Sequence, residues 1–198
     1  MSDKINVVED DGLGCCDRRS TIKALAMGSV ALFAGAGIAT PANAQYPPMA
    51  CVQEGWRYCG KCQGMFYGLA SASQGGLGVC PAGGAHTMGA GSGFYYERVG
   101  VSVAGVQQGG WNWCAKCMGF FYSMAGAGMG PCPAGARHIN AGSPAYAAVL
   151  GGDSTGQQGG WRWCGKCMGM FFSRSSTQGV CPAGGTHSGG SEPYASLH

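Results

Sequence analysis

Nine cysteines and three histidines of this chain recur in one pattern that could bind metal. A C-x2-C pair is followed by a third cysteine in a C-P-A-G motif, and a histidine comes six positions after that cysteine. The gap between the second and third cysteine falls from 17 to 14 to 13 residues, which is typical of a loop. Three cysteines and one histidine form a common ligand set of structural zinc. The spacing therefore predicts three Cys3His zinc sites, whose ligands are Cys59, Cys62, Cys80 and His86; Cys114, Cys117, Cys132 and His138; and Cys164, Cys167, Cys181 and His187.

A lysine lies inside each C-x2-C pair, at Lys61, Lys116 and Lys166. Three thiolates around Zn²⁺ leave one net negative charge. We expect these lysines to offset that charge from just outside the ligands, because such surrounding groups commonly tune a metal site.

Disulfide bonds are the alternative reading of the cysteines. Removal of a leader containing Cys15 and Cys16 would leave 10 of the 12 cysteines, an even number that includes Cys51. If each C-x2-C pair closed on itself, Cys51 and the three C-P-A-G cysteines would have to pair among themselves. That pairing breaks the symmetry of the pattern and leaves the recurring histidine unexplained, so we favour metal, and a mixture of the two remains open.

The metal pattern belongs to a longer repeat. Trp56, Trp111 and Trp161 are spaced 55 and then 50 residues apart, and each copy ends in G-S-x-x-Y. We divide the chain into a leader (1–44), copy 1 (45–104), copy 2 (105–154) and copy 3 (155–198), with the three copies forming one domain.

Alternating residues within each copy favour short β-strands. In copy 3 this pattern predicts an extended segment at 161–163, a return strand at 170–172 and a further short strand at 194–197. The sequence thus predicts an all-β protein whose three repeats form a pseudo-threefold, β-trefoil-like body with zinc-ribbon-like knuckles. Three tandem zinc-ribbon-like beads are the alternative, disfavoured because beads of about 50 residues have little core.

The aromatic residues allow two interpretations. The tryptophans could stack on a ligand at the surface, or they could pack in the core and shield the metal. Met65 and Met170 share their repeat position with Phe120, which favours a core position over a copper site. The candidates for stacking are Trp56, Trp111, Trp113, Trp161 and Trp163.

Composition argues against several classes of function. Charged residues make up only 11% of the chain and the net charge is +3, so we expect no nucleic-acid partner. No carboxylate recurs in all three copies, and a fully ligated Cys3His ion lacks the open position that a zinc hydrolase needs. We therefore expect a protein that is not an enzyme.

The first 44 residues resemble an export signal. Arg18 and Arg19 precede a weakly apolar, glycine-containing run, and Ala42-Asn43-Ala44 fits a cleavage site before Gln45. The arginine pair favours the twin-arginine pathway over an ordinary secretory signal. Because that pathway carries folded proteins, zinc could be loaded in the reducing cytoplasm before export. We expect a periplasmic or extracellular protein with no transmembrane anchor after cleavage.

The unit W-x-W-C-x-K-C-x-G-x-F-F, C-P-A-G-G-x-H, G-S-x-x-Y resembles a tandem repeat of secreted, often glycine-rich microbial proteins. The likeness covers about 51–197; copy 2 departs from it at Ala136, and copy 1 has Tyr58 in place of the second tryptophan. The resemblance supplies no catalytic residues. Ricin-type lectins carry Q-x-W where this chain has Q-x-x-W, so no sugar site transfers from them.

Together these features predict an exported, zinc-stabilised repeat protein that acts as a binding or structural module. Three equivalent loop sets suit an extracellular ligand such as a polymer or a surface. One alternative is a metal-handling protein that binds zinc or copper reversibly. A second alternative is an accessory subunit of an exported enzyme.

Overall fold

The computed structural model describes residues 52–100, 104–124, 128–189 and 193–198. The predicted leader, its cleavage site and Cys51 lie outside the described residues. Within the described residues, no helix is long and apolar enough to cross a membrane. Apart from one short 3-10 turn, η1 (Ala72–Gln74), the regular structure of these residues is entirely β.

Each copy contributes three strands in the same arrangement. A long first strand pairs antiparallel with a short return strand and, on its other side, with the last strand of the copy. The predicted return strand 170–172 and final strand 194–197 of copy 3 are confirmed. The strands are β1 (Val52–Tyr58), β2 (Met65–Tyr67) and β3 (Tyr95–Val99); β4 (Gln107–Trp113), β5 (Phe120–Tyr122) and β6 (Tyr146–Leu150); and β7 (Gln157–Trp163), β8 (Met170–Phe172) and β9 (Tyr194–Leu197).

A glycine bulge interrupts each long strand just before its tryptophan. In β1 the pairing with β3 shifts register between Gln53 and Trp56, and Gly55 there has a φ of 95°. Glycine adopts this left-handed conformation without steric penalty, and a bulge of this kind bends the strand. The bend explains why glycine recurs before the tryptophan of every copy.

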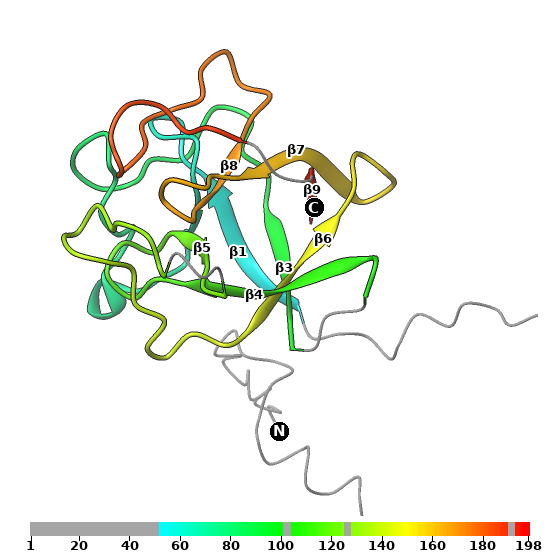
Figure 1. The fold of residues 1–198 in the computed structure, drawn as a ribbon, viewed down its shortest axis with the longest axis horizontal. Helices are drawn as coiled ribbons and strands as arrows, with labels where there is room; N and C mark the ends of the chain where they lie inside the picture. The colour runs from blue at the N-terminus through cyan, green and yellow to red at the C-terminus, as the bar shows by residue number, and fades with distance from the viewer. Residues whose placement is uncertain (1–51, 101–103, 125–127, 190–192) are drawn as a thin grey trace, which may run out of the picture. The chain divides into compact units, whose positions relative to one another are not determined.

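The last strands of the three copies pair with one another. β3 pairs with β6, β6 with β9, and β9 with β3, so the copies close into a single, nearly closed, barrel-like sheet (Figure 1). The predicted all-β body with three repeats is therefore confirmed, and the alternative of separate beads is wrong. The finer assignment to the β-trefoil class stays a prediction.

The core lies where the three copies converge. Trp56, Trp111 and Trp161 are fully buried there, together with the final-strand tyrosines. Met65, Phe120 and Met170 are also buried in this cluster, as expected for a core position. Burying one large side chain contributes about 1.5–3 kcal/mol, so convergence of the copies supplies the core that a single copy lacks.

Glutamine–tyrosine hydrogen bonds join each copy to another. Tyr146 of copy 2 donates its hydroxyl hydrogen to the Gln53 side chain of copy 1. The remaining two pairs repeat this bond around the ring, from Tyr194 to Gln108 and from Tyr95 to Gln158. The recurring Q-x-x-W and G-S-x-x-Y motifs therefore hold the copies together.

Candidate metal centres

Two facing turns build each candidate metal centre. In copy 1 the first turn follows β1, where the Gln63 amide donates to the Cys59 carbonyl at 2.7 Å. The second turn is the C-P-A-G motif, where the Gly83 amide donates to the Cys80 carbonyl at 2.9 Å. Both turns recur in copies 2 and 3 with the same backbone bonds. The short strands thus present two turns: the first carries two cysteine ligands, and the second carries the third cysteine and leads to the ligand histidine three residues further on.

All twelve predicted ligands come together in the predicted sets of four. Within each set the sulfur and nitrogen atoms lie within 4.8 Å of one another, and every side chain is buried. The first and third cysteine sulfurs are 3.8, 3.9 and 3.9 Å apart in copies 1, 2 and 3. The second cysteine sulfur lies 3.6, 3.4 and 3.5 Å from the histidine Nδ1. Each set could hold a metal ion.

The nine cysteines of these sets are free thiols rather than disulfides. A disulfide requires two sulfurs about 2.03–2.05 Å apart, well below the separations found here. The disulfide alternative is therefore wrong for these nine residues. Cys51 lies outside the described residues.

The side chains of the copy 1 set share charge unequally. The hydrogen bond with Cys62 lowers the pKa of Cys59 to about 2, whereas the same bond raises the pKa of Cys62. Burial lowers the pKa of His86, but its bonds to Cys59 and Cys80 outweigh that effect and raise the pKa to about 9. Negative charge thus gathers on buried sulfur, which attracts a soft cation.

The predicted lysines fasten the two turns to each other. The Lys61 ammonium donates to the Gly83 carbonyl at 2.6 Å, and Lys116 does the same to Gly135 at 2.6 Å. Lys166 donates to the carbonyls of Gly184, at 3.1 Å, and Thr186, at 2.6 Å. These bonds explain why lysine recurs inside every C-x2-C pair. The proposed neutralisation of thiolate charge stays a prediction.

A buried phenylalanine orients each ligand histidine. The sequence alone did not lead us to expect this role for the phenylalanine. Phe66 stacks on the His86 ring with centroids 4.7 Å apart and an interplanar angle of 13°. The equivalent pairs, Phe121 with His138 and Phe171 with His187, have centroid distances of 4.7 and 4.9 Å. The available signal was the recurring phenylalanine at the centre of every return strand.

The three centres are linked around the ring. The His86 Nε2 atom lies 3.2 Å from the carbonyl oxygen of Cys117, a ligand of the next centre. The Tyr67 amide donates to the Met118 carbonyl at 2.9 Å, and the equivalent bonds run from Tyr122 to Met168 and from Phe172 to Gln63. The residues that shape one centre therefore support its neighbour. We call each such junction a seam.

Close backbone approach at every seam requires glycine. A Cβ on Gly179 would lie 2.0 Å from the Cys62 carbonyl oxygen, and the φ of Gly179 is 64°. Gly78 and Gly130 occupy the same place against Cys117 and Cys167, with distances of 2.2 and 2.3 Å. The loop that carries the third cysteine is thus pressed against the second cysteine of another copy.

A small, mainly apolar hollow of about 40 Å³ lies among the three centres. Each copy lines it with its second ligand cysteine, its histidine and the proline of its C-P-A-G turn. These residues are Cys62, His86 and Pro81; Cys117, His138 and Pro133; and Cys167, His187 and Pro182. The centres therefore surround a common space instead of facing separate surfaces.

The prediction of ligand stacking is wrong for three of the five tryptophans. Trp56, Trp111 and Trp161 have no exposed surface and pack against core tyrosines. Trp113 and Trp163 are half-buried and contact Tyr67 and Tyr122 of neighbouring copies. The glycine bulge and the convergence of the copies carry the first tryptophan of each copy into the core.

No protein family model, no curated protein and no solved structure matches this chain. The resemblance to a repeat of secreted microbial proteins stays a prediction. The residues of the three centres and their surroundings are therefore the basis on which a function is inferred.

Proposed function

We propose that this protein is an exported, zinc-stabilised binding or structural module that is not an enzyme. The observation that carries the proposal is the set of three buried Cys3His groups joined at their seams. Zinc in such a site is structural, because four protein ligands complete its tetrahedron and leave no position for a substrate.

The ligand separations support zinc as the ion. Tetrahedral bonds of about 2.3 Å to sulfur and about 2.0–2.1 Å to nitrogen place two sulfurs about 3.8 Å apart and a sulfur about 3.5 Å from the nitrogen. The sulfur–sulfur distances of 3.8–3.9 Å and the sulfur–nitrogen distances of 3.4–3.6 Å match both values. When bound, the ion would supply cross-links between the two turns of each copy.

The surroundings of the centres favour a structural role over metal handling. The twelve ligands are between 0% and 6% exposed, and the lysines fasten the two turns beside them. An ion held this way should exchange slowly, whereas a carrier needs accessible ligands. The lack of a carboxylate among the residues lining the central hollow also supports a role other than metal-assisted hydrolysis.

The arginine pair and the A-x-A motif of residues 1–44 support export, and metal loading before export accounts for free thiols in an exported protein. After export, three copies of one loop set suit a repetitive extracellular ligand such as a polymer or a surface.

Chelation tests the structural role. The chain from Gln45, purified with its metal, is incubated with EDTA and with a stronger zinc chelator, and its far-ultraviolet circular dichroism is followed during heating. We expect the mild chelator to leave the metal in place and the strong chelator to abolish the cooperative melt. Ready loss of metal with an unchanged melt would instead indicate a metal carrier.

A further inference from the structure

A hollow of about 450 Å³ lies at the seam between copies 2 and 3. The C-P-A-G loop of copy 2 forms one wall, and the C-x2-C turn of copy 3 forms the other. Its lining residues are Gly130, Pro131, Ala136, Arg137, Gly165, Lys166 and Met168. The hollow is distinct from the apolar space among the metal centres, because it contains two cations and none of the metal ligands.

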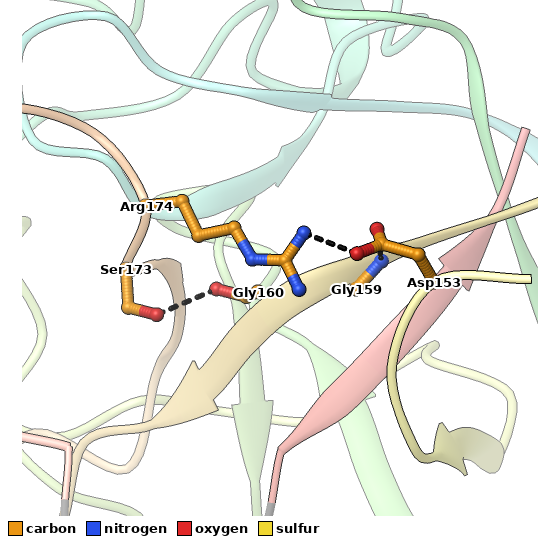
Figure 2. Close-up of polar contacts among 5 residues, drawn as sticks. All are labelled: Asp153, Gly159, Gly160, Ser173 and Arg174. Carbon is orange, nitrogen blue, oxygen red and sulfur yellow. Dashed lines mark hydrogen bonds and ion pairs between the residues drawn. The ribbon is translucent and has the colours of Figure 1, made fainter.

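The two cations of this hollow, Arg137 and Lys166, have no carboxylate among the lining residues. Two cations that line one hollow repel each other, and an acidic group usually offsets that repulsion. The nearest comparison in copy 3 is Arg174, whose guanidinium pairs with Asp153 at 2.5 Å (Figure 2). Another described acid, Glu97, is buried and accepts a hydrogen bond from Ser196. These two acids are therefore engaged elsewhere.

Arg137 is exposed, and among the described residues it makes no side-chain hydrogen bond or ion pair. Its guanidinium lies against the backbone of Gly128, where a Cβ would come within 2.4 Å of Nη1. The other N–H donors of its planar fork remain available, and that fork matches the two oxygens of a carboxylate or phosphate.

Lys166 is held in place and still has a donor to spare. Two of the three hydrogens on its ammonium bond to the Gly184 and Thr186 carbonyls. The remaining N–H is available to a ligand in the hollow. Because the side chain is already fixed by those bonds, a ligand would lose little affinity to ordering it.

Only this seam has both cations. The lysine recurs in every copy, but the position of Arg137 is Ala85 in copy 1 and Thr186 in copy 3. The four ligands come together in every copy, whichever of the three residues stands at that position. The fold and the metal therefore do not require arginine there, and its presence calls for another reason.

We propose that the seam between copies 2 and 3 is an anion-binding site, in which Arg137 and Lys166 bind the carboxylate or phosphate group of a small molecule or polymer. Arg137 supplies the planar fork and Lys166 a point charge. This inference goes beyond the proposed function, since it holds whatever metal occupies the three centres.

Nuclear magnetic resonance of the metal-loaded chain from Gln45 tests the site. Inorganic phosphate and acetate are titrated in separate arms at constant ionic strength, and amide shifts are followed. We expect saturable shifts that centre on Gly130, Arg137 and Lys166 in at least one arm, and the arm that saturates identifies phosphate or carboxylate as the preferred group. Absence of saturation in both arms would overturn the proposal.

Three variants sharpen the result, each checked for three bound metals by mass spectrometry. Arg137→Ala introduces the residue that copy 1 already carries, and it should weaken binding about tenfold or more because a charged hydrogen-bond donor is lost. Lys116→Ala removes one cation and one exposed hydrogen bond at another seam and should leave binding unchanged. Ala85→Arg places the arginine opposite Lys116 and should raise the stoichiometry from one anion to two.

Two outcomes of the variant series would overturn the assignment. If Arg137→Ala keeps three bound metals and an unchanged affinity for the anion, Arg137 is not part of the binding site. Equal weakening by Arg137→Ala and Lys116→Ala would show a general charge effect instead of a site at this seam. Loss of metal from the Lys116→Ala variant alone would bear on the proposed function and leave the anion site to be judged by Arg137→Ala.

Discussion

The metal centres have identical residues in all three copies, whereas the ring formed by the final strands β3, β6 and β9, which we call the strand ring, does not. Every centre has the same four ligands, the same stacked phenylalanine and the same lysine. In the strand ring, one equivalent position holds Glu97 in β3, Ala148 in β6 and Ser196 in β9, and all three residues are buried. Metal coordination demands identical residues, whereas a packed strand ring accepts different side chains provided that polar atoms find partners.

The strand ring accommodates its one carboxyl group through a hydrogen bond. The Ser196 hydroxyl donates to a Glu97 carboxyl oxygen at 2.6 Å, and Glu97 is 1% exposed. Burial raises the pKa of Glu97 to about 8, against smaller opposing effects from Ser196 and Arg98. The strand ring is thus the region where pH should act on the core, and the metal centres are the region where chelation should act.

The largest expected effect is the loss of one ligand. Cys117→Ser should remove the metal of copy 2 and unfold the body, because zinc binding contributes about 10–16 kcal/mol in small peptides and a domain is stable by only about 5–15 kcal/mol. In any fraction that stays folded, metal binding in copy 1 should also weaken, because loss of the copy 2 metal frees the turn whose Cys117 backbone carbonyl contacts His86. Circular dichroism and metal analysis measure both effects.

Lys116→Ala is the matched control for Cys117→Ser. It removes only the exposed bond to Gly135, so three metals and a nearly unchanged melting temperature are expected. A Cys117→Ser protein that melts like the wild type would contradict the structural role of the metal.

A smaller effect is expected from Glu97→Gln in the strand ring. The folded pKa of Glu97 is about 8, above the unfolded value of about 4.3, so its carboxyl group favours the folded state at low pH and loses that contribution as pH rises toward 8. Between pH 6 and pH 9 the free energy of unfolding of the wild type should fall by about 3 kcal/mol relative to that of the variant. Glutamine has nearly the same shape as glutamate but does not ionise.

Urea unfolding of the wild type and Glu97→Gln at several pH values measures this difference. Metal-linked titration affects both proteins equally and therefore cancels. Parallel stability curves for the two proteins would show that Glu97 does not titrate in the folded body.

A matched glycine pair tests how tightly the seams are packed. Gly179 and Gly185 have φ values of 64° and 65°, but only Gly179 faces another copy, and a Cβ on Gly185 would meet nothing within 4 Å. Alanine at either position would be strained, because its φ must stay in the left-handed region. Gly179→Ala should lower the free energy of unfolding by a further ~1–3 kcal/mol, because its Cβ is overpacked against Cys62. Equal melting temperatures for Gly179→Ala and Gly185→Ala would show that the seam can move apart to make room for the added Cβ.

The smallest effect is expected outside both regions. Arg174 and Asp153 form an exposed ion pair, and Asp153 also accepts the Gly159 amide at 2.9 Å (Figure 2). The Arg174 guanidinium lowers the pKa of Asp153, but solvent screens the pair. Arg174→Ala should leave the melting temperature unchanged, and a marked drop would show that this loop supports the core.

Local spacing was enough to predict the ligand sets and the strand types. The two-residue gap of Cys59 and Cys62 and the six-residue step from Cys80 to His86 describe turns, whose geometry depends on nearby residues. The return strand 170–172 followed from the same local pattern. All twelve ligands therefore occupy the groups that the sequence predicts.

Contacts between copies could not be predicted in this way. Tyr146 bonds to Gln53 across 93 positions, and nothing local to either residue names its partner. The tryptophans illustrate the same limit: Trp161 and Trp163 alternate as strand residues should, yet only the convergence of three copies decides that Trp161 is fully buried and Trp163 is half-buried. Burial depends on the assembled body, which spacing within one copy does not encode.

Native mass spectrometry of the chain from Gln45 tests the central claim most directly, because one spectrum counts bound metals and disulfides together. We expect three zinc ions per chain, with the nine cysteines of the centres reduced. A folded chain that carries no metal, with those nine cysteines and Cys51 joined in five disulfides, would contradict this expectation.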